Sequence, residues 1–217
     1  PFEPRELVAR IHALLRRTLP SMDQFECRAG VPRAHRQTPH DRYLLHYQPG
    51  LQVAEPWLEF VSELQGPVYK AFLRQMFGQH TFLPTFEWFY AWNGCDIAPQ
   101  CDAARKLATH IFYFNTEEDW NPEWGGQILI LDDERRFSPS SEPRFEQFKI
   151  AAAVESSGNG SLLLQRTQHA WHGVRPLICP PDKLHRLFIV TLTLPGLQVW
   201  WRGFRGQDAD GYNLKAA

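Results

Sequence analysis

Short hydrophobic segments separated by turn residues dominate the second half of the chain. Each is bounded by Gly, Pro, Asn or Asp and is rich in aromatic, β-branched or aliphatic residues, which is typical of β-strands. The segments are TFEWFYAW, LATHIFYFN, GGQILIL, FKIAAAVES, GSLLLQR, LHRLFIVTLTL and LQVWWRGF. They show no internal repeat. The pattern therefore predicts a β fold from about residue 81 onwards.

The residues before these strands follow a different pattern. Residues 54–77 have hydrophobic positions at helical spacing, interrupted once at Gly66-Pro67, which predicts two helices because Pro favours the first turn of a helix. Residues 21–53 begin with a polar stretch rich in Pro, Arg and His, and we interpret them as a linker or loop. Helices followed by a run of strands predict helices packed against a double-sheet β fold, and residues 54–217 are expected to form this domain.

The first residues predict a helix of their own. Leu7, Ile11, Leu14 and Leu15 fall on one helical stripe, and arginines gather towards its end. The wording PFEPRELVARIHALLRR resembles the last helix of an OmpR-type receiver domain, so residues 1–20 are expected to be an N-terminal helix of this kind. They include no phosphoacceptor aspartate. Either a receiver domain precedes them in a longer chain, as the first residue Pro1 would fit, or the helix is retained for packing.

Composition narrows the class of protein. The 217 residues are 43% hydrophobic and 22% charged, as in a soluble domain with a sizeable core. The formal net charge of −1 gives no field for binding nucleic acid or an anionic membrane, and no stretch is long enough to span a bilayer. The four cysteines include no CxxC pair. This usage predicts a reducing, cytoplasmic setting.

Four motifs carry the candidate chemistry. They are GCDIAPQCDAARKLATHIFYFN, WNPEWGGQILIL, QHAWHGVRPL and HRLFIVTLTL, in this order. Together they resemble iron(II)/2-oxoglutarate-dependent oxygenases of the prolyl-hydroxylase type. That family has a His-X-Asp pair, a strand ending in Tyr-Leu-Asn or Tyr-Phe-Asn, a Trp followed by Gly-Gly-X-Leu, a distal histidine and a basic residue. The resemblance covers about residues 81–194 and implies a double-stranded β-helix, or jelly roll.

The resemblance also implies a site and an activity. Asp102 and His172 match two metal ligands, and Gln100 stands where the family has its first histidine. Tyr113 and Arg186 match the residues that hold 2-oxoglutarate. The implied cofactors are Fe(II) and 2-oxoglutarate, with ascorbate as an optional addition. The implied reaction is hydroxylation of a protein or peptide side chain, most often proline.

Elementary chemistry agrees with this assignment except at one position. Two imidazoles and a carboxylate on one side of iron(II) leave open positions for a 2-oxo acid and oxygen. Residues i and i+2 of a strand share a face, so residue 100 and Asp102 can chelate together. The guanidinium of Arg186 pairs with carboxylates. The amide of Gln100, however, is a weak neutral ligand.

Several alternatives follow from Gln100. The chain is an enzyme that tolerates a weaker ligand, or a pseudo-oxygenase that binds a peptide or 2-oxoglutarate, or a chain in which the histidine was deliberately replaced. A purely structural, cupin-like jelly roll is a further alternative.

Other candidate residues near the motifs have more ordinary interpretations. Cys101 is expected on the opposite face from its neighbours, and His110 is expected to be a packed or surface histidine. His169 is expected to lie beside the metal ligands or at the surface. Residues 135–148 are expected to form a surface loop or a mobile insertion near the substrate entrance.

Overall fold

The computed structural model of the chain describes residues 15, 18–28, 42–78, 81–156, 158, 160–196 and 201. These residues form two antiparallel sheets. The large sheet has the order β1 (Glu26–Arg28), β2 (Arg42–His46), β3 (Leu83–Ala91), β10 (His185–Thr193), β5 (Lys106–Tyr113) and β8 (Ser161–Gln165). The small sheet has the order β4 (Ile97–Gln100), β9 (Trp171–Val174), β6 (Ile128–Asp132) and β7 (Lys149–Val154). Short 3-10 helices lie at Met22–Gln24, Pro122–Trp124 and Phe145–Gln147.

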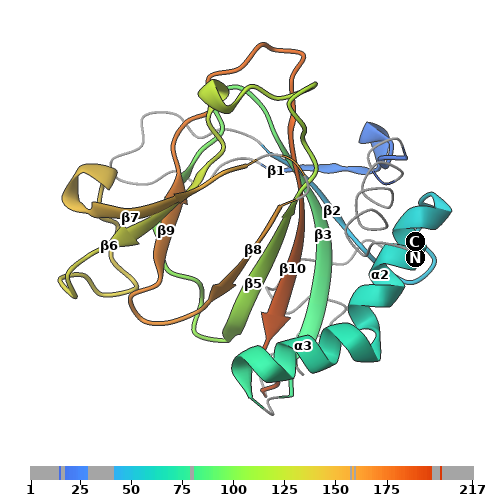
Figure 1. Cartoon of the computed structure of the whole chain (residues 1–217), viewed down its shortest axis with the longest axis horizontal. Helices are drawn as coiled ribbons and strands as arrows, with labels where there is room; N and C mark the ends of the chain where they lie inside the picture. Colours follow the sequence, from blue (N-terminus) through green and yellow to red (C-terminus); the bar gives the residue numbers. More distant parts are fainter. Residues whose placement is uncertain are drawn as a thin grey trace, which may run out of the picture.

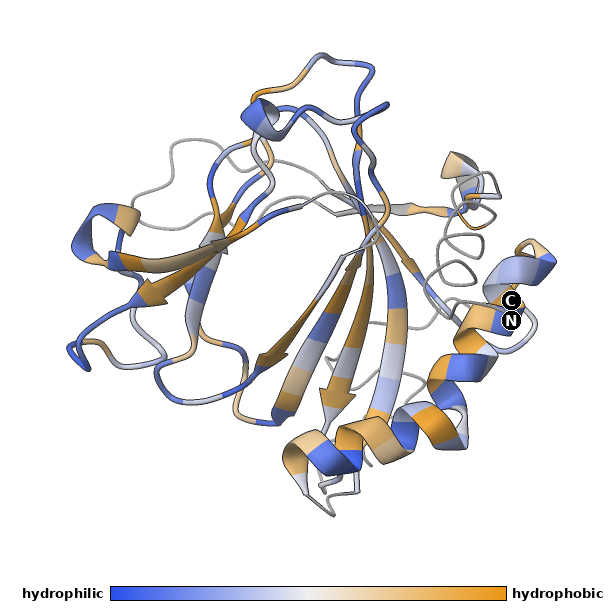
Figure 2. Cartoon of the chain, in the orientation of Figure 1, coloured by the Kyte–Doolittle hydropathy of each residue, from blue (hydrophilic) through white to orange (hydrophobic). Residues whose placement is uncertain are grey.

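This arrangement confirms the predicted mainly β fold, a jelly roll with packing helices. Non-consecutive strands are neighbours in both sheets, as expected of a double-stranded β-helix. Figure 1 shows the small sheet opposite the large one, and Figure 2 shows hydrophobic residues concentrated on the strands. The predicted strand LQVWWRGF lies outside the described residues apart from Trp201.

The two predicted helices are present and cover the outer face of the large sheet. They are α2 (Glu55–Gln65) and α3 (Pro67–Phe77), separated by Gly66 (Figure 1). Trp57 is fully buried against the rings of Trp88 and Phe188, and its indole N–H donates to the Thr18 carbonyl at 3.0 Å. This helix–sheet layer is the largest hydrophobic core of the described residues. Its other buried members include Val61, Leu64, Leu73, Phe86, Phe114, Val190 and Leu192.

The range 21–53, predicted to be a linker or loop, instead contributes two strands to the large sheet. β2 pairs with β3, and β1 extends the sheet by one further strand. Leu44 and Leu45 point to opposite faces, and both are buried because the sheet is covered on both sides. Both strands are short and have polar neighbours in the sequence, so the hydrophobic pattern did not predict them. Of the predicted N-terminal helix, residues 1–14, 16 and 17 lie outside the described residues, whereas Leu15 is fully buried in the same core as Trp57.

A second hydrophobic core fills the space between the sheets. It contains Ile111, Tyr113, Leu187, Ile128 and Val174, contributed by strands of both sheets. Gly173 of β9 lies on the other face of the small sheet, where a Cβ would come within 2.7 Å of the Ile97 carbonyl oxygen and 2.9 Å of the Phe145 ring. No helix in the described part of the chain is long and apolar enough to cross a membrane.

Candidate functional site

The pairing of β4 with β9 brings two predicted ligands together. Gln100 is directly opposite His172 in the register, although an irregularity separates this pair from the Ile97–Val174 pair. His172 Nδ1 lies 3.0 Å from the Ala170 carbonyl oxygen. A carbonyl only accepts, so Nδ1 carries a proton, and in the neutral ring Nε2 has the lone pair that a metal ligand needs.

Asp102 lies immediately after β4 and is held by two donors from β5. Lys106 Nζ donates to Oδ1 at 3.0 Å, and Thr109 Oγ1 donates to Oδ2 at 2.8 Å. Burial by itself raises the pKa of the carboxyl group, but the charges of Lys106 and His172 and the two hydrogen bonds outweigh it and lower the pKa. Asp102 is therefore an ionised carboxylate near His172, with a donor on each oxygen.

These residues match an iron(II) site poorly. A facial triad needs three firm ligands, and the amide of Gln100 replaces one imidazole. The carboxylate that would bind the cation already bears the ammonium of Lys106. Within the described ranges, no group of three His, Cys, Asp or Glu side chains is placed to hold a metal ion. The position therefore offers a metal ion one suitable imidazole and one carboxylate that already pairs with an ammonium.

Tyr113, the predicted co-substrate ligand, lies in the interior between the sheets. It is almost fully buried in the same core as Ile111. Thr109, two strand positions before Ile111, points to Asp102. The Tyr113 hydroxyl has no hydrogen-bond partner among the described residues, and burial raises its pKa. A buried hydroxyl of this kind is a donor available to a bound molecule.

Arg186, the other predicted co-substrate ligand, points to the face of β10 that is turned away from the space between the sheets. It pairs in register with Tyr90 and alternates with Leu187, which faces the interior with Tyr113. Its Nη1 donates to Asp119 Oδ2 at 2.8 Å. The structure thus brings Gln100, Asp102 and His172 together but places the Arg186 guanidinium in an ion pair with the loop after β5.

His185 occupies the interior position at the start of β10. It is buried beside Trp120 and Tyr113, with ring centroids 4.8 and 6.4 Å away. Burial lowers its pKa to about 4, although a backbone hydrogen bond with Ser156 and the charge of Asp119 act in the other direction. Nε2 has no hydrogen-bond partner among the described residues. The imidazole is therefore neutral at pH 7, and Gly126 leaves room for it, since a Cβ there would lie 2.9 Å from Nε2.

His185 lines a small cavity between the sheets. The volume is about 50 Å³, and the other lining residues are Phe89, Ala91, Cys95, Asp96, Ile97, Ile111, Gly126, Ile128, Val174, Leu177, Leu187 and Ile189. None of these described lining residues carries a fixed positive charge. An engineered apolar cavity that accepts benzene measures about 150 Å³, and 2-oxoglutarate is larger than benzene and doubly charged. The cavity therefore does not fit the co-substrate.

The remaining predicted candidates lie away from this interior. His110 is buried on the helix side of β5, where its Nδ1 lies 2.8 Å from the Tyr69 hydroxyl, and burial lowers its pKa to about 4. Cys101 packs against the Trp171 cluster on the outer face of the small sheet, and its thiol donates to the Gln168 carbonyl at 3.6 Å. Burial, with a contribution from Asp133, raises the pKa of this thiol to about 11. It is consequently a poor nucleophile and a poor metal ligand at neutral pH.

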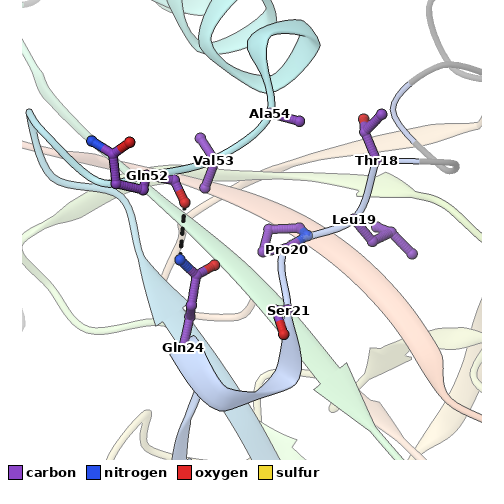
Figure 3. Close-up of a pocket in the computed structure, with 8 residues that line it drawn as sticks. All are labelled: Thr18, Leu19, Pro20, Ser21, Gln24, Gln52, Val53 and Ala54. Carbon is purple, nitrogen blue, oxygen red and sulfur yellow. Dashed lines mark hydrogen bonds between the residues drawn. The ribbon is translucent and has the colours of Figure 1, made fainter.

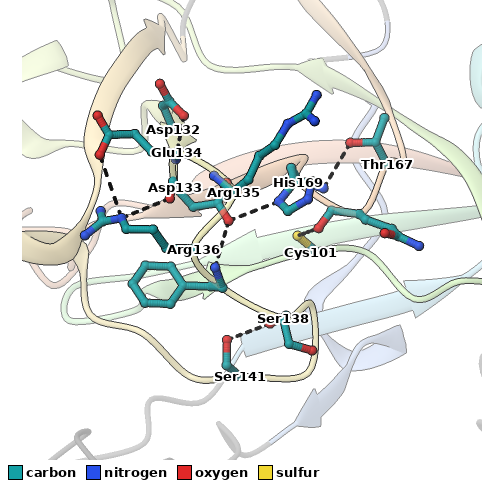
Figure 4. Close-up of polar contacts among 12 residues, drawn as sticks. Cys101, Asp132, Asp133, Glu134, Arg135, Arg136, Ser138, Ser141, Thr167 and His169 are labelled. Carbon is teal, nitrogen blue, oxygen red and sulfur yellow. Dashed lines mark hydrogen bonds and ion pairs between the residues drawn. The ribbon is translucent and has the colours of Figure 1, made fainter.

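His169 contacts a buried carboxylate outside the interior. Its Nδ1 lies 3.1 Å from Asp133 Oδ2, and the backbone N–H groups of Arg135 and Phe137 donate to the same buried carboxylate (Figure 4). Burial by itself raises the pKa of Asp133, but these hydrogen bonds and the charge of His169 outweigh it and lower the pKa. Asp133 thus fixes the start of the loop 133–148 to the turn before β9.

This network predicts a pH-dependent contribution to stability. Because the folded-state pKa of Asp133 is depressed, its stabilising contribution is present above the pKa of the unfolded chain and is lost as the pH falls below about 4. Asp133→Asn should therefore lose less stability than the unaltered chain between pH 6 and pH 3, measured by urea unfolding at the two pH values. Asp132→Asn, at an exposed neighbour, is the control and should keep the original difference. An equal loss in Asp133→Asn would contradict the assignment.

A second hollow lies between the N-terminal segment and the residues before α2. It has a volume of about 510 Å³ and is open, and Gln24 Nε2 donates to the Gln52 carbonyl at 2.9 Å across it (Figure 3). Its described lining consists of neutral residues: Thr18, Leu19, Pro20, Ser21, Gln24, Gln52, Val53 and Ala54. These side chains supply neither an acid, nor a base, nor a metal ligand.

Comparison with known proteins agrees with the fold. A prolyl-4-hydroxylase of Pseudomonas putida is 18% identical, with a TM-score of 0.54 over 89% of each chain. A prolyl hydroxylase of Trichoplax adhaerens, solved with a hypoxia-inducible-factor peptide, is 11% identical, with a TM-score of 0.53 over 88% of this chain and 94% of its own. The Fe(II)/α-ketoglutarate-dependent dioxygenase TqaL is 13% identical, with a TM-score of 0.51 over 88% of this chain and 76% of its own. No family model and no curated protein matches the sequence. The chain therefore has the jelly-roll fold of the iron(II)/2-oxoglutarate dioxygenases.

Proposed function

We propose that this chain is a peptide-binding domain with the prolyl-hydroxylase-like oxygenase fold, and that it does not catalyse the oxygenase reaction. The observation that carries the proposal is the small interior cavity, in which neutral His185 stands where a dicarboxylate would need a fixed cation. The replacement at Gln100 supports the same conclusion from the metal side. The fold and the assembled Asp102–His172 geometry are kept without the chemistry.

A peptide is the partner best supported by the surface of the small sheet. β7 is an edge strand that pairs only with β6 among the described residues, and the side chains of residues 149–153 are all exposed. Extended peptides bind such edges by adding a strand. The Trichoplax protein of the same fold was solved with a peptide. Ile150, exposed on β7, is the apolar contact that we assign to the peptide.

The catalytic part of the proposal is tested by succinate formation. The unaltered chain, supplied with iron(II), 2-oxoglutarate and ascorbate, should release no more succinate than a reaction without protein. Gln100→His/His185→Arg adds an imidazole and places a guanidinium in the interior, but it should still not bind 2-oxoglutarate measurably by calorimetry, because the cavity remains too small for it. Arg186→Ala is the control, because it removes a cation that lies outside the cavity, and it should leave succinate release at the level of the reaction without protein. Succinate release by the unaltered chain would rule out the proposal.

The peptide part is tested by selecting peptides from a displayed library. Selected peptides should bind the unaltered chain, and Ile150→Glu should weaken them by at least about tenfold, because it removes an apolar contact and adds a charge at the edge. Ile178→Glu is the matched control, since Ile178 is the same residue type and is even more exposed but lies in the loop after β9. Equal losses in the two variants would count against β7 as the binding edge.

A second candidate is a weak dioxygenase that hydroxylates a protein or peptide side chain. It is favoured by the adjacency of Gln100 and His172 and by the unpartnered hydroxyl of Tyr113. Asp102, His172 and Gln100 would then hold iron(II), with Tyr113 and Arg186 on 2-oxoglutarate. Arg186 would first have to leave Asp119 and enter the interior. The same succinate assay separates the two candidates.

A further inference from the structure

The site around Asp102 contains its own cation. Lys106 Nζ lies 3.0 Å from Oδ1, and the side chains of Lys106 and Asp102 are only 18% and 9% exposed. Thr109 Oγ1 occupies the other oxygen at 2.8 Å. The carboxylate is therefore charge-neutralised and given a donor on each oxygen by residues of this chain alone.

We propose that Lys106 is the resident cation of this site, taking the electrostatic role that a metal ion would have beside Asp102 and opposing the entry of a divalent cation. This inference rests on the proposed non-catalytic function and explains how the site stays stable without metal. Gln100 weakens metal binding because it replaces a firm ligand, and the charge of Lys106 would weaken it further by repelling the metal ion. Lys106 is thus a positioning and excluding residue, separate from the ligands themselves.

The local chain path makes this contact intrinsic to the fold. The Lys106 backbone N–H donates to the Ala103 carbonyl at 2.9 Å, so a tight turn returns the chain over Asp102. Arg166 Nε also donates to the Asp102 carbonyl at 3.2 Å and places a second cation beside the same residue. The turn between β4 and β5 therefore delivers the ammonium to the carboxylate without help from a distant loop.

Physical chemistry predicts that a divalent ion and this ammonium compete. Both are attracted to one carboxylate, and like charges a few ångströms apart in a poorly solvated site repel strongly. The ammonium of Lys106 is covalently tethered, so dilution does not remove it. A metal ion must either displace Lys106 into solvent or share the carboxylate with it, and both cost affinity.

The test measures Mn(II) binding by calorimetry and Co(II) binding by visible absorption, without any activity assay. Gln100→His should bind Mn(II) weakly, and Gln100→His/Lys106→Met should bind it at least about tenfold more tightly. Gln100→His/Lys106→Arg, which keeps the charge, should be as weak as Gln100→His. Gln100→His/Lys70→Met controls for net charge, because Lys70 is exposed on α3. Lys106→Gln replaces Lys106→Met in the double variant should the methionine protein fail to fold.

Two results would overturn this inference. Equal Mn(II) affinity in Gln100→His and Gln100→His/Lys106→Met would show that Lys106 does not oppose the metal, and tight binding in the Lys106→Arg double variant would show the same. Neither result bears on catalysis by the unaltered chain. Succinate release by the unaltered chain would instead remove the proposed function, so the two failures are distinguishable.

Discussion

Trp57→Ala should lower the free energy of unfolding by about 3–5 kcal/mol, the range for truncating a large aromatic side chain in a packed core. Trp57 is fully buried, and its ring contacts those of Trp88, Phe114 and Phe188. The substitution leaves a cavity between α2 and the large sheet and frees the Thr18 carbonyl that accepts from the indole. Urea or guanidinium unfolding at neutral pH measures the loss.

A conservative variant separates the packing contribution from the hydrogen bond. Trp57→Phe keeps an aromatic ring but removes the indole N–H, so it should lose clearly less stability than Trp57→Ala. Val68→Ala on α3 is the surface control, because Val68 is mostly exposed and should change stability by less than about 0.5 kcal/mol. Equal effects of Trp57→Ala and Val68→Ala would contradict the helix–sheet core described above.

Lys106→Met should lower the free energy of unfolding by about 3 kcal/mol, the lower end of the range for removing one partner of a buried ion pair. The variant leaves the Asp102 carboxylate in a poorly solvated position with one remaining side-chain donor, Thr109. Chemical unfolding at pH 7, with EDTA present in all samples, measures the effect without interference from trace metal.

A double-mutant cycle assigns this loss to the pair. Asp102→Asn/Lys106→Met removes both charges together, so it should be more stable than the sum of the two single losses predicts. Lys70→Met is again the control for charge and helix packing. Strict additivity of the two single variants would mean that the ammonium and the carboxylate do not interact energetically.

Much of the fold was predictable from the hydrophobic pattern. The two helices around Gly66-Pro67 and most of the longer strands appear where the sequence indicates them, because each has a local period and flanking turn residues. β4 and β9 did not give such a signal, since each is only four residues long. Their pairing nevertheless places Gln100 opposite His172, so the predicted neighbourhood of the metal ligands is present.

The co-substrate side of the site could not be predicted in the same way. β10 is a central strand covered by helices on one face and by the small sheet on the other, so hydrophobic residues occur at both odd and even positions. Alternation says that His185 and Arg186 point in opposite directions but not which one points inwards. The register of Leu187 with Tyr113 decides it, and the interior receives His185.

The sequence by itself determined the two helices, most of the longer strands after them and the class of fold, whereas β1 and β2 were not predicted. The residues that meet at β4 and β9 were indicated by the family resemblance. Only the tertiary structure decided which face of β10 lines the interior, how small the cavity is, and that Lys106 neutralises Asp102. The physical reason is that periodicity encodes local geometry, whereas burial on both faces and strand register depend on segments far apart in the chain. The contact of Lys106 with Asp102 depends on the path of the turn between β4 and β5, which has no periodic pattern.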